Sequence, residues 1–140
     1  MKTLNVWLDE YSESHQNPVN KNIHWICVPV IYFSVVGMLY ALHPWAAYGA
    51  LIAALAFYIP LSLSLAAGMI LLTAIMLAAI HAIPHILWVS IALFVAAWIG
   101  QFYGHKVEGK KPSFFKDVQF LLVGPIWLLN FVYQRLGIKT

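Results

Sequence analysis

Most of the chain consists of long apolar segments separated by short polar breaks, a pattern that predicts membrane helices. Five apolar runs cover residues 23–42, 45–59, 61–83, 85–103 and 114–136. At a rise of about 1.5 Å per residue, the longer runs are sufficient to cross the hydrocarbon core of a bilayer. The run 45–59 is shorter, so we expect it either to span with little tilt or to be re-entrant.

The N-terminal segment has a different pattern. The apolar residues of segment 3–13 fall on one helical face, namely Leu4, Trp7, Leu8 and Tyr11. This pattern predicts an amphipathic helix that lies on the membrane surface. Polar loops are expected over 15–22, where Pro18 is a helix breaker, and over 104–112.

The composition also indicates a membrane protein. Of the 140 residues, 62% are hydrophobic and 9% are charged, against about 45–50% and about 25% in soluble domains. No Asp, Glu, Lys or Arg occurs from Ile23 through Tyr103. We therefore predict an all-α fold, a polytopic membrane helical bundle forming one domain over residues 1–140. It has five hydrophobic helices, or four if one is re-entrant, plus the N-terminal interfacial helix.

Charge and cysteine content exclude several classes of protein. The net charge is +3, and the lysines flank the hydrophobic segments, which indicates membrane topology instead of nucleic-acid binding. The single Cys27 excludes an internal disulfide and a Cys-rich metal site, and we interpret it as a small buried hydrophobe. The N-terminus lacks the apolar core and cleavage site of a signal peptide, so insertion is expected to use the transmembrane helices.

Counting helices places the two polar segments on one side of the membrane. Four crossings separate them, so both face the side that also carries six lysines, with Arg135 and Lys139 on the other side. The excess of lysine predicts that the first side is cytoplasmic. Three histidines fall on the opposite side: His43, His81 and His85. This argument depends on the run 45–59 crossing the bilayer.

Three histidines and one acid in the polar segments are candidates for a metal site. They are His15, His24, His105 and Glu108. Imidazole and carboxylate are the usual ligands of redox-active non-haem iron, and two His with one carboxylate leave coordination positions open. The spacing matches no HExxH-type motif. The alternative therefore stays open that these histidines cap helix ends and contact lipid head groups.

Polar neighbours extend the candidate site. Side-chain amides can accept the second ring N–H of a metal-bound histidine, and the candidates are Asn17, Asn20 and Gln101. The alternative for the asparagines, and for Asn22, is helix capping. Three cations, together with Gln101, are candidates for binding an anionic substrate: Lys106, Lys110 and Lys111. Anchoring to the cytoplasmic face is the alternative for these lysines.

The same two segments carry paired motifs. The first motif reads Tyr11, His15, Asn17-Pro18, Asn20, Ile23-His24 and Val28-Pro29. The second reads Gln101-Phe102, Gly104-His105, Glu108 and Lys110-Lys111-Pro112, and Gln119 and Gly124-Pro125 follow. With these motifs the chain resembles, over nearly its whole length, the 2-hydroxy fatty acid dioxygenase-like family of small integral membrane proteins. In that family's fungal pattern the acid lies four residues after the second motif's histidine, whereas here it lies three after.

The resemblance implies an Fe(II)-dependent dioxygenase that uses O2 to shorten a 2-hydroxy fatty acid by one carbon. It implies His15, His24 and His105 as iron ligands, and it places Glu108 as a ligand or a base. We expect Glu108, Asn17 and Asn20 to be catalytic residues, and the acyl tail to lie among the last three apolar runs. The other expected partner is the lipid bilayer, with no nucleic acid, and an oligomer is compatible with the sequence. The expected location is a bacterial inner membrane, or the endoplasmic reticulum of a eukaryote, with the N-terminus and active site cytoplasmic.

Other functions remain as alternatives. One is a non-enzymatic membrane protein that binds lipid or assists assembly, with histidines capping helices. Metal retained after purification would favour the enzyme over this alternative. A second is a transporter or proton-linked channel subunit, against which the uncharged membrane segments argue. A third is a lipid hydroxylase or desaturase, against which the missing eight-histidine pattern argues.

Overall fold

The computed structural model describes residues 2–109 and 114–140, with side chains from Gln119 onward in the second stretch. The described residues form six α-helices and no strand: α1 (Leu4–Glu13), α2 (Pro18–Leu42), α3 (Pro44–Tyr58), α4 (Leu63–Ala82), α5 (Ile86–Glu108) and α6 (Phe114–Leu136). Helices α2, α4 and α5 are long and apolar enough to cross a membrane, and α3 is a shorter apolar helix. The predicted all-α membrane fold is confirmed.

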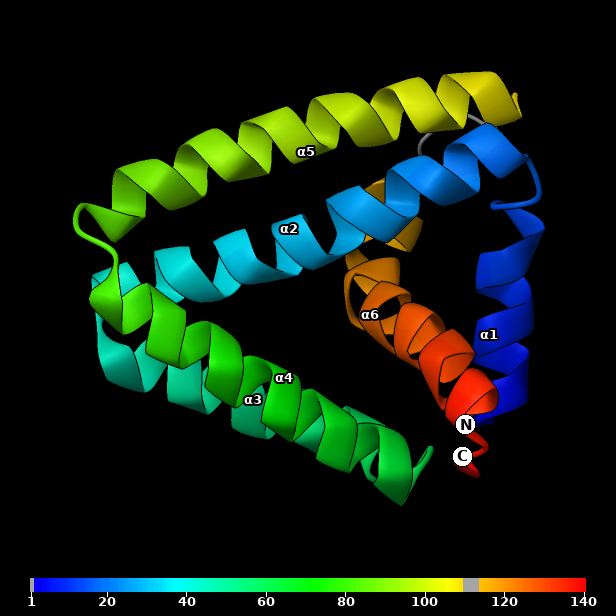
Figure 1. Ribbon diagram of the computed structural model, residues 1–140, viewed down its shortest axis with the longest axis horizontal. Helices are drawn as coiled ribbons and strands as arrows, with labels where there is room; N and C mark the ends of the chain where they lie inside the picture. The colour runs from blue at the N-terminus through cyan, green and yellow to red at the C-terminus, as the bar shows by residue number, and fades with distance from the viewer. Residues whose placement is uncertain (1, 110–113) are drawn as a thin grey trace.

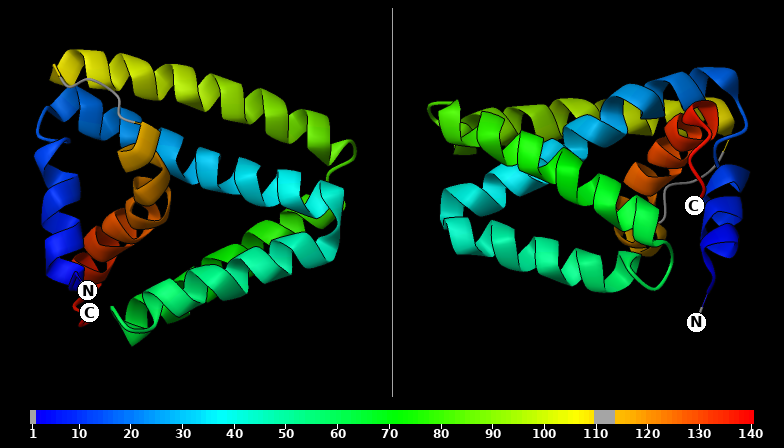
Figure 2. Two further views of the ribbon diagram at one scale, coloured as in Figure 1. Left: turned by 180° about the vertical axis from the view of Figure 1, so that it is seen from behind. Right: turned by 60° about the horizontal axis from the view of Figure 1, so that its bottom comes forward.

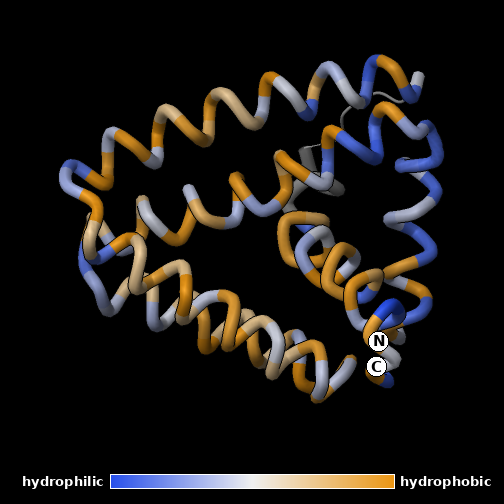
Figure 3. The backbone as a smooth tube through the Cα atoms, viewed as in Figure 1, coloured by the Kyte–Doolittle hydropathy of each residue, from blue (hydrophilic) through white to orange (hydrophobic). Residues whose placement is uncertain are grey.

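The helices form a V whose corner lies at His43, between α2 and α3 (Figure 1). Helix α5 lies against α2 and α4 lies against α3, so each arm of the V is an antiparallel pair. Helix α6 occupies the open end of the V, and α1 runs across that end (Figure 2). The start of α2 and the end of α5 therefore meet there, and hydrophilic residues gather around this meeting point (Figure 3).

The distribution of histidines follows the predicted helix count. Three lie at the closed corner: His43 caps α3, His81 is in the last turn of α4, and His85 precedes α5. The other three, described below, lie together at the open end. Although α3 is short, it returns the chain from the closed corner to the open end of the V, as the predicted number of crossings required (Figure 1).

Two segments predicted as polar loops are partly helical. Helix α2 begins at Pro18 because Asn17 caps it, with its side chain accepting a backbone N–H two residues later, and proline suits the first helical position. Helix α5 continues to Glu108 and ends at Gly109, which adopts a left-handed φ of 76°. The polar residues of both segments are therefore held on rigid helix ends.

Counting helices predicted that the last helix would carry the chain to the side opposite the N-terminus. Helix α6 instead ends at the open end of the V (Figure 1). The Ser64 hydroxyl donates to the carbonyl of Lys139 at 2.7 Å, and Thr140 lines a surface groove with Lys2. The C-terminal residues therefore lie beside the N-terminal segment, and Arg135 and Lys139 do not mark the other side. The physical reason is that α6 packs across α1, α2 and α4 at the open end of the V.

Small residues allow α2 and α5 to approach closely. Each of three glycines faces a side chain of the other helix: Gly37 faces Ser90, Gly100 faces Cys27 and Gly104 faces Asn20. A Cβ atom added at Gly100 would lie 2.8 Å from the sulfur of Cys27, closer than real Cβ contacts. Close backbone approach through small residues is a general means of joining helices where lipid removes the hydrophobic driving force.

We expect Gly104→Ala to lower the free energy of unfolding by about 1–3 kcal/mol, the usual cost of overpacking. The added Cβ would overlap Asn20, which is held by hydrogen bonds to Ser14 and Glu108. Gly49→Ala is the matched control, because nothing lies within 4 Å of its Cβ position. Thermal unfolding in mild detergent, followed by tryptophan fluorescence, should separate the two variants, and equal midpoints would contradict the packing described.

Candidate functional site

Three histidine rings from separate segments converge at the open end of the V. His15 lies between α1 and α2, His24 lies on α2, and His105 lies in the last turn of α5. The ring centroids are 4.1 Å apart for His15 and His24, 5.4 Å for His24 and His105, and 6.0 Å for His15 and His105. Their exposed fractions are 1%, 1% and 7%. The predicted meeting of these side chains is thus present in the fold.

Backbone carbonyls orient two of the three rings. His15 Nδ1–H donates to the carbonyl of Tyr11, and His24 Nδ1–H donates to that of Asn20 at 2.9 Å. Each ring then keeps Nε2 as the nitrogen with a lone pair. Burial lowers the pKa of His15 to about 4, against the opposing effect of its bond to Tyr11, so this imidazole is neutral at pH 7. Neutral imidazole is the form that binds metal ions.

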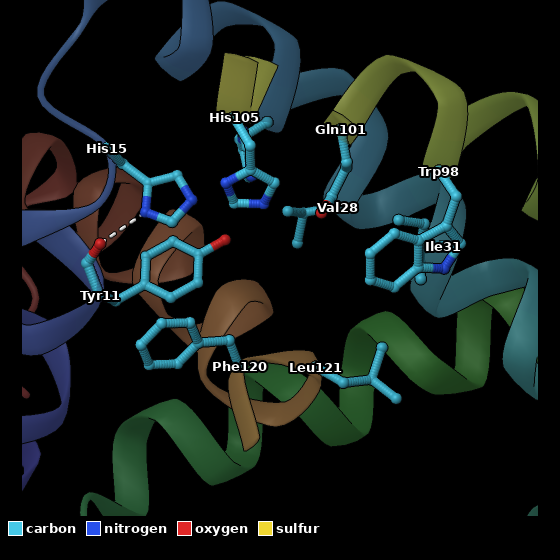
Figure 4. A pocket seen from close by; sticks show the side chains of 10 residues that line it. Tyr11, His15, Val28, Ile31, Trp98, Gln101, His105, Phe120 and Leu121 are labelled. Atoms are coloured by element: carbon cyan, nitrogen blue, oxygen red, sulfur yellow. Dashed lines mark hydrogen bonds between the residues drawn. The ribbon is translucent and has the colours of Figure 1, made fainter. Parts of the chain in front are cut away.

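The three rings line a cavity of about 30 Å³. Its polar lining is Tyr11, His15, His24, Gln101 and His105, and its apolar lining is Val28, Ile31, Trp98, Phe120 and Leu121. In Figure 4 the Tyr11 hydroxyl, His15 and His105 point toward one space, with Trp98 and Leu121 farther along it. The volume has room for an ion or about two water molecules.

Two lining residues with hydrogen-bonding side chains were not assigned to the site from the sequence. Tyr11 is 2% exposed and stacks on His15 with 4.0 Å between ring centroids and 8° between planes. The indole Nε1 of Trp98 is buried, with no hydrogen-bond partner in the part of the chain that the structure describes. Tyr11 belongs to the first polar motif, which signals its role. Trp98 lies in an apolar run and carries no such signal.

Glu108 lies next to the histidines, but its carboxylate is bound to the start of α2. Its Oε1 accepts the backbone N–H of Asn17 at 2.8 Å and the side-chain N–H of Asn20 at 3.2 Å. A carboxylate at the C-terminus of α5 is unfavourable for that helix dipole, and contact with the N-terminus of α2 offsets this cost. In this arrangement Glu108 holds together the helix ends that carry His24 and His105.

The other predicted site residues are divided between the site and its surroundings. Asn17 caps α2, and Asn20 bridges Ser14 and Glu108. We predicted that side-chain amides would accept the second ring N–H of the histidines. For His15 and His24, main-chain carbonyls accept it instead. Gln101 lines the cavity and Lys106 is exposed on α5, while Lys110 and Lys111 lie outside the described residues.

The donor chemistry fits a metal ion, although the site is not preformed. In the described stretches, no group of three His, Cys, Asp or Glu side chains is already arranged to hold one. His15 Nε2 is nevertheless buried, and the described residues offer it no hydrogen-bond partner. Native proteins rarely leave such an atom unsatisfied. Two neighbouring imidazoles complete a set of three nitrogen ligands that side-chain rotation can bring together.

Replacing Glu108 with Ala should lower the free energy of unfolding by about 1–2 kcal/mol, because hydrogen bonds to a carboxylate are lost at a partly exposed position. Glu108→Gln keeps an acceptor oxygen and should cost less. Glu10→Ala is the control, since it removes only an exposed ion pair with Lys2, a type worth about 0–1 kcal/mol. Thermal unfolding measures all three, and a Glu108→Ala midpoint equal to that of Glu10→Ala would refute the bridging role.

Comparison with known proteins identifies the family of the chain. No curated protein and no solved structure matches the chain. A family model described as 2-hydroxy-palmitic acid dioxygenase Mpo1-like matches residues 1–136. The match includes the full length of all six helices and every residue of the histidine cavity. The chain therefore belongs to the Mpo1-like family.

Proposed function

We propose that the protein is an Fe(II)-dependent dioxygenase that shortens 2-hydroxy fatty acids by one carbon. The observation that supports this best is the meeting of three buried imidazoles from distant segments in a member of the Mpo1-like family. His15, His24 and His105 would hold the iron. When bound, Fe(II) would supply the capacity to bind and activate O2.

The proposed reaction balances without a further co-reactant. R–CH(OH)–COOH and O2 give R–COOH, CO2 and H2O. The bond between C1 and C2 breaks, C1 leaves as CO2, and C2 becomes the carboxyl carbon of the shorter acid. O2 accepts the four electrons that the two carbons lose, so no external reductant is needed.

The protein's own residues would bind and orient the substrate at the polar end of the membrane helices. The polar wall of the cavity, with Tyr11 and Gln101, suits the carboxylate and the 2-hydroxyl group. The apolar wall, with Val28 and Trp98, would face the first methylene groups of the chain. Lys106, exposed near the end of α5, would attract the anionic head group. Lys110 and Lys111 keep the same proposed role.

We propose a cytoplasmic orientation for this end of the molecule, in a bacterial inner membrane or in the endoplasmic reticulum of a eukaryote. Lys21 and Lys106 lie on α2 and α5, which meet at the open end of the V, and Lys2 lies just before α1. An excess of lysine next to membrane helices favours the cytoplasmic side. Substrate and site would then meet at the cytoplasmic head-group level.

Lipid binding without catalysis is the main alternative, with histidines serving only as caps. The described helix ends argue against it. Asn17 caps α2, and Gly109 terminates α5. The His43 side chain caps α3 at the closed corner, and His15 bonds the carbonyl of Tyr11 near the end of α1. That bond uses Nδ1 and leaves Nε2 of His15 buried, with no partner among the described residues. The buried imidazoles therefore need another explanation, and a bound ion provides it.

The first test is the iron content of protein purified anaerobically in mild detergent. We expect about one iron per chain, because three imidazoles and a small cavity form one site. His24→Ala and His105→Ala should each lose it. His81→Ala is the control, since His81 is exposed at the closed corner, where it bonds Tyr40. Absence of iron from the wild type after Fe(II) reconstitution would overturn the proposal. Loss of iron from His81→Ala would overturn it too.

The second test is O2 uptake with 2-hydroxy-palmitate. We expect equal amounts of O2 consumed and CO2 released, with no turnover of palmitate or 3-hydroxy-palmitate, because only the 2-hydroxy acid gives the balanced reaction. His105→Ala should reduce the rate by more than about 100-fold, beyond the loss typical of an outer partner of a metal ligand. Full turnover in that variant would contradict the assigned site.

A further inference from the structure

A second cavity lies on the apolar side of the histidines, inside the V. It has a volume of about 180 Å³ and is bounded by side chains of α2, α3, α4 and α6. The walls that matter here are Tyr32, Val36 and Leu39 of α2, Ala47 and Ala54 of α3, and Leu121 of α6. An apolar cavity of about 150 Å³ in another protein stays dry and takes up benzene, so this one has room for part of a hydrocarbon chain.

The two cavities share a wall. Leu121 lines both the histidine cavity and the larger cavity, and Ile31 and Tyr32, adjacent on α2, line one each. In Figure 4 Leu121 lies on the side of the histidine cavity away from His15. Leu121 is therefore part of the wall between the two cavities, and its side chain can change rotamer without movement of the backbone.

The histidine cavity alone is too small for the proposed substrate. Its volume of about 30 Å³ has room for an ion or about two water molecules, and not for an acyl chain. The chain must continue into another volume. Another apolar groove, between Trp25 and Pro125, shares no lining residue with the histidine cavity. The cavity beyond Leu121 is thus the better candidate.

The length of this path is sufficient for the acyl chain of a membrane lipid. His24 and Leu39 are fifteen residues apart on α2, which is about 22 Å at 1.5 Å per residue. One acyl chain fills roughly half of a bilayer core of about 30 Å. The far end is bounded by Leu39 and Ala47 near the closed corner, and Ala47 is buried with 4% exposed.

We infer that the cavity between α2, α3 and α6 binds the acyl chain of the substrate, with Leu121 at its entrance and Ala47 at the wall that limits chain length. This inference rests on the proposed function. It places the tail against α2 and α3 as well as α4 and α6, whereas the sequence led us to expect it among the last three apolar runs alone. Buried methylene groups of the substrate contribute to binding there.

The test compares Ala47→Leu with Ala53→Leu, an exposed neighbour on the same helix, using 2-hydroxy acids of increasing chain length. Ala47→Leu fills the far end, so its preference should shift to shorter chains, with kcat/KM for the longest substrate falling at least about 10-fold. Ala53→Leu should keep the wild-type profile. Normal turnover with an unchanged profile in Ala47→Leu would overturn the inference and leave the proposed function standing.

A binding measurement covers the cases in which turnover is absent or Ala47→Leu does not fold. Wild-type protein is photolabelled with a 2-hydroxy fatty acid that carries a diazirine near its methyl end, and the labelled peptides are identified by mass spectrometry. Label around Leu39 and Ala47 supports the chain site even if no dioxygenase activity is found. Label confined to α5 or to the outer surface of α6, or no specific label, overturns it.

Discussion

The close packing of α2 against α5 is the constraint on which the site depends. Gly104 faces Asn20, one turn before His24, and it directly precedes His105. The same contact that sets the spacing of the two helices therefore sets the spacing of two of the three histidines. Glu108 fixes the ends of these helices against sliding, because it bonds the first turn of α2 from the last turn of α5.

The site is also where the fold leaves polar atoms unsatisfied. Among the described residues, four buried side-chain polar atoms have no hydrogen-bond partner, and three of them surround the histidines: His15 Nε2, Asn20 Oδ1 and Trp98 Nε1. Such atoms are costly, more so in a membrane protein with little other polar material. Their concentration in one place is the expected result when a structure is shaped for a ligand instead of for stability alone.

The sequence predicted the helices and the grouping of the histidines, because long uncharged runs and prolines leave few alternatives. It did not predict that α2 begins at Pro18 or that α5 reaches Glu108. Polar residues there looked like loops, whereas their side chains satisfy one another across two helices. The path of α6 could not be predicted by counting helices, since a helix with Pro125 in its interior can lie across its neighbours as well as span the membrane. Trp98 was missed because one tryptophan in an apolar run looks like any other.

The wide separation of the site's parts in the chain has a consequence for biogenesis. His15 and His24 emerge early in synthesis, and the later of them, His24, precedes His105 by about eighty residues. At about 5–20 residues per second this is a delay of roughly 4–16 seconds. The site is incomplete throughout that interval and closes only when α5 has inserted and found α2. Completion of the histidine cluster therefore reports correct membrane insertion, and a chain arrested midway exposes two imidazoles without the third.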